Sequence, residues 1–288
     1  MRIKTSVVPK RFLRSAFQAA PAALILIALN CARSAASDFL SLETGMLANS
    51  NITNAANKAD RLDDTAFNFT LSGGRLVQLG PFNSLTAGLA FEESLHREYN
   101  GLTAHTGRLS LSWWHKFGIG PRKPVLTVGA SVSGKDSRYS DLDEIRYETE
   151  IRVKERLSGV VDVTAAMNIE SHRAGNRYFD GGATTLSLTL GMSAPADARV
   201  ELGCSERHGD SIWYISSPGW MRVGGFSGLY DMYYITWVSR TRLLAGTVLY
   251  PVGPASSVYA GFETRNTTWD GLSYPNNIVK LGFNHAFR

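Results

Sequence analysis

The stretch from Pro124 to Arg156 reads PVLTVGASVSGKDSRYSDLDEIRYETEIRVKER, and it decides the fold class. In residues 124–133 the apolar side chains fall at every second position, namely Leu126, Val128, Ala130 and Val132. Residues 144–156 alternate in the same way, but most positions between their apolar side chains are charged. Successive side chains of a β-strand point to opposite faces. The stretch therefore predicts two strands, each with one apolar face, joined by a polar loop over 134–143.

The same alternation recurs along the chain. It is clear in residues 84–95, 108–117 and 184–193, where large apolar side chains alternate with small, polar or charged ones. We expect strands at 38–48, 64–79, 84–95, 102–117, 124–133, 144–156, 160–172, 183–193, 198–208, 232–250, 256–265 and 276–288. Most of these exceed the roughly 9–11 residues with which a tilted strand crosses a bilayer. In the strand at 232–250, residues 233–238 could instead belong to the preceding loop.

The connections distinguish a membrane barrel from a soluble β-sandwich, which shows the same alternation. Tight links are expected at 80–83, 118–123, 157–159, 194–197 and 251–255. Longer polar links lie between them, at 49–63, 96–101, 134–143, 173–182, 209–231 and 266–275. Short turns that alternate with longer loops are typical of outer-membrane barrels. The sequence therefore predicts an all-β fold, a transmembrane antiparallel β-barrel of about twelve strands with both termini on the periplasmic side.

Residues 1–36 have the composition of a secretory signal peptide. A basic start is followed by an apolar run from Ala19 to Leu29, and Ser34-Ala35-Ala36 offers the small residues that a signal peptidase needs. The apolar run is shorter than the roughly 20 residues that span a bilayer as a helix. We expect cleavage after Ala36, so that residues 37–288 form one domain, the barrel. Cys31 leaves a lipoprotein as the alternative, although Asn30 stands where a lipobox has a small residue.

The formal net charge of +5 comes from this N-terminal segment. Residues 1–36 contain six Lys and Arg and no acid, so residues 37–288 contain 24 basic and 25 acidic residues. This balance argues against nucleic acid as a partner. Cys204 is the one cysteine in 37–288, which rules out an intrachain disulfide there. No apolar run in 37–288 approaches the roughly 18 residues of a transmembrane helix.

The last segment alternates up to the C-terminus. Val279, Leu281, Phe283 and Phe287 share one face of residues 278–288. A final strand with an aromatic residue at its end resembles the assembly signal of bacterial outer-membrane β-barrel proteins, here with Phe287 penultimate and Arg288 appended. The strand rhythm and length of residues 37–288 resemble twelve-stranded porin-like outer-membrane proteins of proteobacteria. The resemblance implies an outer-membrane location and insertion by the barrel assembly machinery, guided by Phe283 and Phe287, and it implies no particular substrate.

If the apolar faces meet lipid, the charged faces line the lumen, because a basic residue at mid-depth on the lipid face costs up to about 2–4 kcal/mol. The predicted lumenal charges that set selectivity are Arg108, Arg146, Glu148, Glu150, Arg152, Arg240, Arg242 and Lys280. Other inward candidates are Glu92, Glu144, Lys154, Asp162, Glu170, Arg199, Glu201, Arg207 and Glu263. Two hypotheses remain open. The basic side chains form a ladder that guides anionic solutes, or the acids and bases pair across the lumen and fill it.

The link at 209–231 is unusually apolar for an outer loop. It contains Ile212, Trp213, Tyr214, Ile215, Trp220, Met221, Phe226 and Tyr230. Exposed apolar surface of this extent marks a contact. We expect Trp213, Tyr214, Trp220 and Phe226 to form either a constriction folded into the lumen or a surface that contacts lipopolysaccharide or another partner. A simple extension of the strands is the third possibility.

Residues for catalysis or metal binding are not prominent. Membrane-embedded hydrolases of this architecture place a His and a Ser together, and none of the six histidines is followed two residues later by Ser. His208 and Asp210 could imitate part of an outer-membrane protease site, although a solvated loop rim is the simpler interpretation. No Cys and His cluster has zinc spacing. The sequence therefore predicts neither an enzyme nor a bound metal or cofactor.

Three functions are compatible with this reading. The first is a narrow porin-like channel for small hydrophilic solutes, with selectivity set by the lumenal charges and the 209–231 loop. The second is a closed barrel with a structural or surface-interaction role, and the third is an integral outer-membrane hydrolase. The expected partners are membrane lipid, lipopolysaccharide and the assembly machinery. A monomer is expected, because trimeric porins are usually larger.

Overall fold

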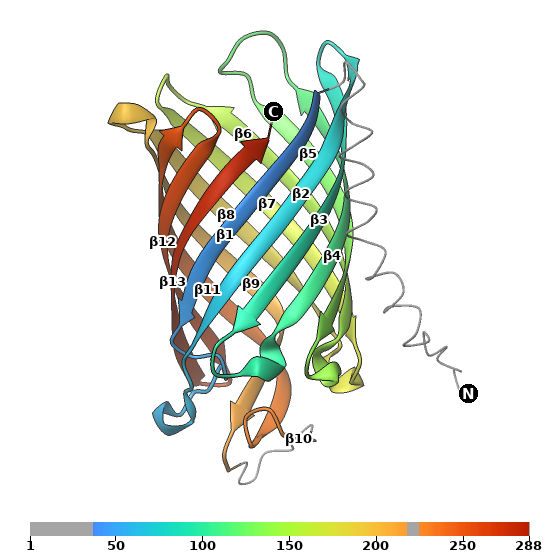
Figure 1. Ribbon diagram of the computed structural model, residues 1–288, viewed down its shortest axis with the longest axis vertical. Helices are drawn as coiled ribbons and strands as arrows, with labels where there is room; N and C mark the ends of the chain where they lie inside the picture. The colour runs from blue at the N-terminus through green and yellow to red at the C-terminus, as the bar shows by residue number, and fades with distance from the viewer. Residues whose placement is uncertain (1–36, 218–224, 288) are drawn as a thin grey trace, which may run out of the picture.

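A computed structural model describes residues 37–217 and 225–287, so the expected signal peptide over 1–36 lies outside the described residues. The chain forms a barrel of tilted strands (Figure 1). The strands are β1 Ser37–Asn49, β2 Asp64–Gly80, β3 Asn83–His96, β4 Ala104–Lys116, β5 Val125–Ser137, β6 Glu144–Arg156, β7 Val161–Ala174, β8 Gly181–Ser193, β9 Arg199–Ile215, β10 Gly225–Ser227, β11 Met232–Gly253, β12 Ser256–Trp269 and β13 Leu272–Phe287. Among the described residues, no helix is long and apolar enough to cross a membrane.

The barrel is closed by the first and last strands. β1 pairs with β13 in an antiparallel ladder from Leu40–Phe287 to Asn49–Ile278. β11 pairs with β9 on one side and with β12 on the other, so twelve of the described strands form a continuous antiparallel ring. The short strand β10 pairs with β11 alone. Closure leaves no unpaired edge along the wall, and the prediction of a twelve-stranded antiparallel barrel is confirmed.

The two ends of the barrel differ. Tight connections at 81–82, 157–160, 194–198 and 254–255 and a longer one at 117–124 lie at the end where β1 begins and β13 ends, the top of Figure 1. The opposite end carries longer loops with short 3-10 helices, η1 Lys58–Asp60, η2 Asn100–Leu102, η3 Ser140–Leu142 and η4 Arg177–Phe179, whereas η5 Pro195–Asp197 lies in a tight connection. We call the loop-bearing end the extracellular end, following the pattern of outer-membrane barrels.

The predicted long loop at 266–275 is wrong. β12 and β13 continue through most of it and are joined by Asp270 and Gly271 alone, with φ of 43° and 79°. Asp-Gly is a favoured pair for a two-residue turn that needs positive φ at both positions. The polar residues before and after this turn belong to strands that extend beyond the apolar part of the wall.

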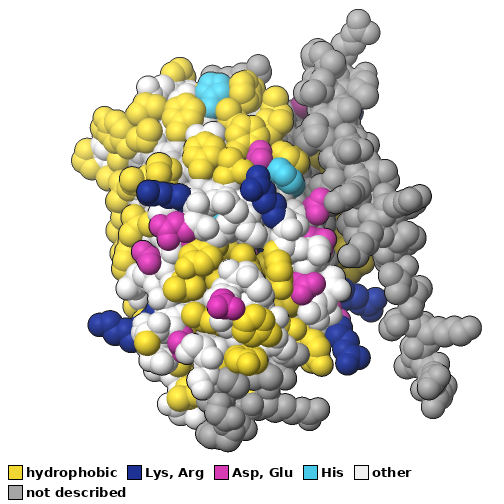
Figure 2. All heavy atoms as spheres, turned by 60° about the horizontal axis from the view of Figure 1, so that its bottom comes forward, with side chains coloured by type: hydrophobic (Ala, Val, Ile, Leu, Met, Phe, Trp, Pro, Cys, Tyr) yellow, Lys and Arg dark blue, Asp and Glu magenta, His cyan; other side chains and the backbone are white. Residues whose placement is uncertain are grey.

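The outer face of the barrel is apolar. Its large side chains remain exposed, including Leu244 at 61% and Leu281 at 57%. In Figure 2 hydrophobic side chains cover the wall at the top of the view, whereas acidic and basic side chains gather nearer the loop-bearing end. Contiguous exposed apolar surface of this kind marks a contact with a membrane or partner, and a belt around a closed barrel fits a bilayer.

Candidate functional site

The candidate site is the interior of the barrel and its extracellular mouth. A cavity of about 640 Å³ has side chains from β5 to β9 and from β11 to β13 in its lining, together with loop residues such as Asn54 and Leu142. Side chains from so many strands can share one cavity only on the concave face of the wall. Glu144, Arg146 and Arg207 lie on this face, and the strand register assigns the remaining positions by alternation.

Most of the predicted selectivity residues lie on the lumenal face, and each of these has an ion pair. Arg108 Nη1 lies 3.2 Å from Glu148, Arg146 Nη2 lies 2.7 Å from Glu144, Arg152 Nη2 lies 2.8 Å from Glu150, and Lys280 Nζ lies 3.2 Å from Glu263. The first of these pairs joins β4 to β6 across β5. The structure therefore brings together the acids and bases that the alternation of β6 indicated.

Asp162 is the centre of a second lumenal group near the periplasmic end. Arg199 donates from Nη1 and Nη2 to the two carboxylate oxygens of Asp162, at 2.9 and 3.0 Å. Lys154 Nζ lies 3.3 Å from the same carboxylate. The Arg199 side chain reaches Asp162 by crossing Gly191, where a Cβ atom would meet the guanidinium. The glycine thus permits a bidentate pair between β9 and β7, which sequence alternation alone does not reveal.

The lumenal face of β2 to β5 carries mostly small side chains, with Glu92, Arg108 and Lys135 among its charged exceptions. The register places Gly74, Gly88, Ser110 and Ser131 side by side on this wall. Ser131 donates to Glu148 on β6 at 3.2 Å, where the charged wall begins. Small side chains leave more of the cross-section unfilled than long charged ones, so free space in the lumen is expected along β2 to β5.

Arg240 and Arg242 do not face the lumen, so their predicted position is wrong. The register pairs Arg242 with Glu206 and pairs Leu244 with Cys204, all on the outer face. Arg240 donates to Glu206 at 2.5 Å. Near Arg242, each face of β11 carries both polar and apolar side chains, and Thr241 and Leu243 point inward. Alternation in the sequence therefore does not indicate which of the two faces lines the lumen. Charge is tolerated on an outer face near the membrane surface, where the cost falls to about 0–1 kcal/mol.

The mouth is crossed by an extension of β9 and β11, which we call the mouth hairpin (Asp210–Ile215 with Tyr233–Val238). β9 and β11 continue their ladder to Ile215–Tyr233, beyond the last β8–β9 rung at Ala183–Gly209. Residues 209–215 and 232–238 are therefore strand rather than loop. Of the three possibilities for the apolar link at 209–231, a simple extension of the strands applies to this part.

One face of the mouth hairpin packs on β12 and β13. Trp213 and Ile235 are each 1% exposed. They form a buried cluster with Ile215 and with Tyr274 of β13. The rings of Trp213 and Tyr274 meet edge to face with centroids 4.9 Å apart. Trp269 adds a second edge-to-face contact with Trp213 at 5.7 Å. This dense aromatic packing holds the hairpin inward over the lumen.

The other face of the mouth hairpin packs on the remaining loops. Tyr214 and Tyr234 are buried with Phe179 and Tyr230, and Tyr214 and Tyr230 have ring centroids 4.6 Å apart. The partly buried residues of this cluster lie around the rim, in the loops before β2, β4 and β6 and at the end of β7, with Ile52, Leu62, Tyr99, Leu102, Leu142 and Ala174 among them. Burial raises the pKa of Tyr230, because the phenolate would lose its hydration there. A hairpin that touches loops on all sides of the rim must extend across the opening.

The loop between β1 and β2 fastens the mouth hairpin. Asn51 and Thr53 are fully buried. The Tyr214 N–H donates to the Thr53 carbonyl at 3.1 Å, and Asn54 Nδ2 donates to the Ile212 carbonyl at 3.2 Å. Asn51 Nδ2 donates to the Pro275 carbonyl on β13. These residues were not predicted from the sequence, because short polar side chains in a loop give no signal of burial.

The other predicted mouth and assembly residues have varied positions. Trp213 and Tyr214 are buried in the mouth hairpin, Phe226 on β10 is 52% exposed, and Trp220 lies outside the described residues. Phe283 and Phe287 lie on the outer face of β13, where His285 contacts both rings. His208 lies on the outer face of β9, whereas Asp210 contributes to the lining of the cavity and accepts a hydrogen bond from the Gly182 N–H at 2.9 Å.

No group of three or more His, Cys, Asp or Glu side chains suited to a metal ion occurs within residues 37–217 and 225–287. No protein-family model and no curated protein matches the sequence. Solved structures match the fold. An outer membrane channel from Pseudomonas putida F1 has a TM-score of 0.59 at 8% identity, covering 88% of this chain and 97% of that one.

The fold is that of an outer-membrane β-barrel. Two further structures align over similar lengths. The KdgM porin in complex with disordered oligogalacturonate has a TM-score of 0.47 at 10% identity, covering 86% of this chain and 99% of that one. The NanC porin has a TM-score of 0.48 at 9% identity, covering 85% of this chain and 98% of that one.

Proposed function

We propose that the protein is a monomeric outer-membrane channel for small hydrophilic solutes. The observation that carries the proposal is the lumen itself, a closed barrel with an apolar exterior whose interior has one densely charged wall and one wall of mostly small side chains. A barrel packed solid for stability alone would not need a row of serines and glycines opposite its charges. The apolar exterior supports placement in a bilayer.

The lumenal charges support weak ion selectivity. Acids and bases pair along β6 and with its neighbours, so their fields partly cancel. Small hydrophilic solutes would pass along β2 to β5, while the ion pairs hold the opposite wall in place. The mouth hairpin would set the upper limit of solute size, because it crosses the opening on the extracellular side.

Liposome swelling tests this function. The protein is reconstituted into vesicles and exposed to neutral sugars of increasing size, with protein-free vesicles as the control. We expect swelling with monosaccharides and a steep fall with tri- and tetrasaccharides. Folding is checked by the shift in gel mobility between unheated and boiled samples. A folded barrel that gives no swelling with any sugar would contradict the channel.

A closed barrel with a surface role is the second candidate. The observation that favours it is the packing of the mouth hairpin on both faces, with Trp213 and Ile235 almost inaccessible. Such a barrel would show no swelling in the wild type, and loosening the mouth hairpin would be needed to produce it. We propose no enzymatic activity, since His208 faces outward whereas Asp210 lines the cavity and is engaged by a backbone amide, so the two side chains do not face one common site.

A further inference from the structure

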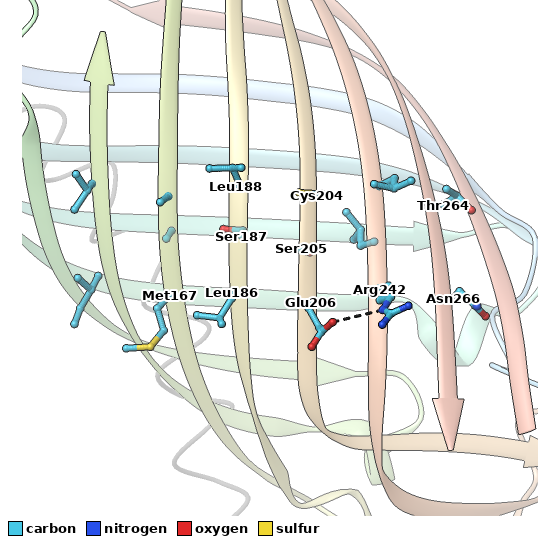
Figure 3. A pocket seen from close by; sticks show the side chains of 16 residues that line it. Met167, Leu186, Ser187, Leu188, Cys204, Ser205, Glu206, Arg242, Thr264 and Asn266 are labelled. Carbon is cyan, nitrogen blue, oxygen red and sulfur yellow. Dashed lines mark ion pairs between the residues drawn. The ribbon is translucent and has the colours of Figure 1, made fainter. Parts of the chain in front are cut away.

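The outer wall carries a groove of about 860 Å³ that extends over strands β6 to β9, β11 and β12 (Figure 3). Its floor is mostly apolar, with side chains from Ile151, Val153, Met167, Leu186, Leu188, Cys204 and Leu244. These residues belong to the outward set of each strand, as the pairs Leu186–Glu206, Leu188–Cys204 and Cys204–Leu244 show. The groove therefore opens toward the membrane and not toward the lumen.

A charged cluster borders the groove at its extracellular side. Arg240 Nη2 lies 2.5 Å and Arg242 Nε lies 3.5 Å from the same carboxylate oxygen of Glu206. Figure 3 shows Glu206 and Arg242 side by side at one end of the apolar residues. We call Glu206, Arg240 and Arg242 the outer arginine cluster. Its two guanidinium groups share one carboxylate, so one positive charge is left unbalanced within it.

The depth of the cluster matches the surface of the membrane. Arg240 pairs with Thr268 at the extracellular end of the β11–β12 ladder, and Arg242 pairs with Asn266 two rungs below. From Leu244 toward the periplasmic end, the outward side chains of β11 are uncharged, and Val248 and Tyr250 are among them. A boundary between polar and apolar side chains at this end corresponds to the level of lipid headgroups in the outer leaflet.

Ion pairs on exposed surfaces contribute little to stability, so the cluster is poorly explained by a structural role. Guanidinium groups bind phosphate with two parallel hydrogen bonds and are readily drawn from a carboxylate to a doubly charged anion. An amphipathic ligand would place its phosphate on the arginines and an acyl chain in the groove below. The polar side chains of Thr264 and Asn266, which also line the groove, could contact its sugar or glycerol part.

We propose that the outer arginine cluster and the groove form a binding site for the phosphorylated lipid A part of lipopolysaccharide. The positive charge of the outer arginine cluster and its depth at the membrane surface indicate which ligand fills the groove, because lipid A is the anionic lipid of the leaflet at this end of the barrel. The inference rests on the proposed outer-membrane location and does not depend on an open channel. A second copy of the chain is the alternative occupant, and the test below separates the two.

The test is native mass spectrometry of the folded protein in detergent, with added lipid A or its dephosphorylated form. We expect the wild type to prefer the phosphorylated lipid, and Arg240→Gln with Arg242→Gln to lower that preference by about fivefold per arginine. Glu206→Gln should raise it, because it frees both guanidinium groups. Arg152→Gln is the matched control, since it removes one lumenal positive charge and should leave lipid binding unchanged.

Three outcomes would contradict the site. Equal binding of the two lipids by the wild type would overturn it, as would equal losses in the Arg152→Gln control. A dimer that disappears in the double arginine variant would assign the groove to a second copy. If the double variant does not fold, the Glu206→Gln variant alone decides, because a merely structural cluster predicts no gain in lipid binding. The experiment measures lipid binding and not conductance. A closed lumen would therefore contradict the proposed channel without affecting the test of the lipid site.

Discussion

Glu170 and Arg207 join two strands that are not neighbours. Glu170 on β7 accepts a hydrogen bond at 2.8 Å from Arg207 Nη2 on β9, across β8. Arg146 on β6 approaches the other carboxylate oxygen of Glu170 at 3.7 Å. One acid thus stands between two arginines on the lumenal wall, close to the mouth. Charges held in a lumen with restricted water interact more strongly than charges on an open surface.

Neutralising this acid should change the ion selectivity of the channel. Glu170→Gln leaves Arg146 and Arg207 without their shared acid, so anions should permeate more easily. Arg207→Gln removes a positive charge and should favour cations. We expect permeability ratios to move by roughly two- to fivefold in opposite directions, measured as reversal potentials in a KCl gradient. Shifts in the same direction, or none, would show that ions do not pass this pair.

Trp213→Ala should open the mouth. Removing a buried aromatic side chain costs about 3–5 kcal/mol, and here the loss falls on the contact that holds the mouth hairpin inward. We expect larger single-channel conductance or faster passage of large sugars. Phe226→Ala is the matched control, because this exposed side chain lies on β10 outside both buried clusters. Equal effects of the two substitutions would argue against the hairpin as the constriction.

Asn51→Ala should loosen the loop that fastens the hairpin. The Asn51 side chain donates to the carbonyls of Ala55 and Pro275 and accepts from the Ala55 N–H and the Thr53 hydroxyl. Leaving buried partners unsatisfied costs about 1–3 kcal/mol each. Faster hydrogen exchange is expected at the Tyr214 amide, which donates to Thr53. Amides in the β5–β6 ladder, far from this loop, should exchange as before.

Gly282→Ala should destabilise the barrel. Tyr259 lies over Gly282 and Gly45 on the lumenal face, and its hydroxyl donates to Glu43 at 2.8 Å. A Cβ at position 282 would meet the ring of Tyr259, and such overpacking typically costs about 1–3 kcal/mol. We expect unfolding at lower urea concentration, followed by gel mobility. Tyr259→Phe keeps the ring and removes only the hydroxyl, so its effect should be smaller, and an equally stable Gly282→Ala would contradict this packing.

The alternation of apolar and polar side chains in the sequence predicted most strands of the barrel wall. The segment 144–156 was predicted with the bounds that β6 has, because its apolar and charged faces are both unambiguous. The tight connections at 81–82 and 254–255 fall where Pro and Gly interrupt the pattern. Local sequence is enough for such strands, since each one needs only a face for lipid and a face for water.

Alternation failed where strands extend beyond the membrane. At this height both faces meet polar surroundings, so Arg240 and Thr241 gave no indication of which one faces the lumen. The residues that cover the mouth were only partly predicted. Trp213 and Tyr214 were recognised from their apolar character, whereas Asn51 and Tyr274 were not, because their burial depends on loops from distant parts of the chain meeting at the rim.

Single-channel recording in a planar bilayer tests the central claim most directly. The folded wild-type protein should give discrete conductance steps with weak ion selectivity, and Trp213→Ala should enlarge the steps. Protein whose gel mobility shows a folded barrel, but which gives no steps in the wild type or in the Trp213→Ala variant, would contradict an open lumen.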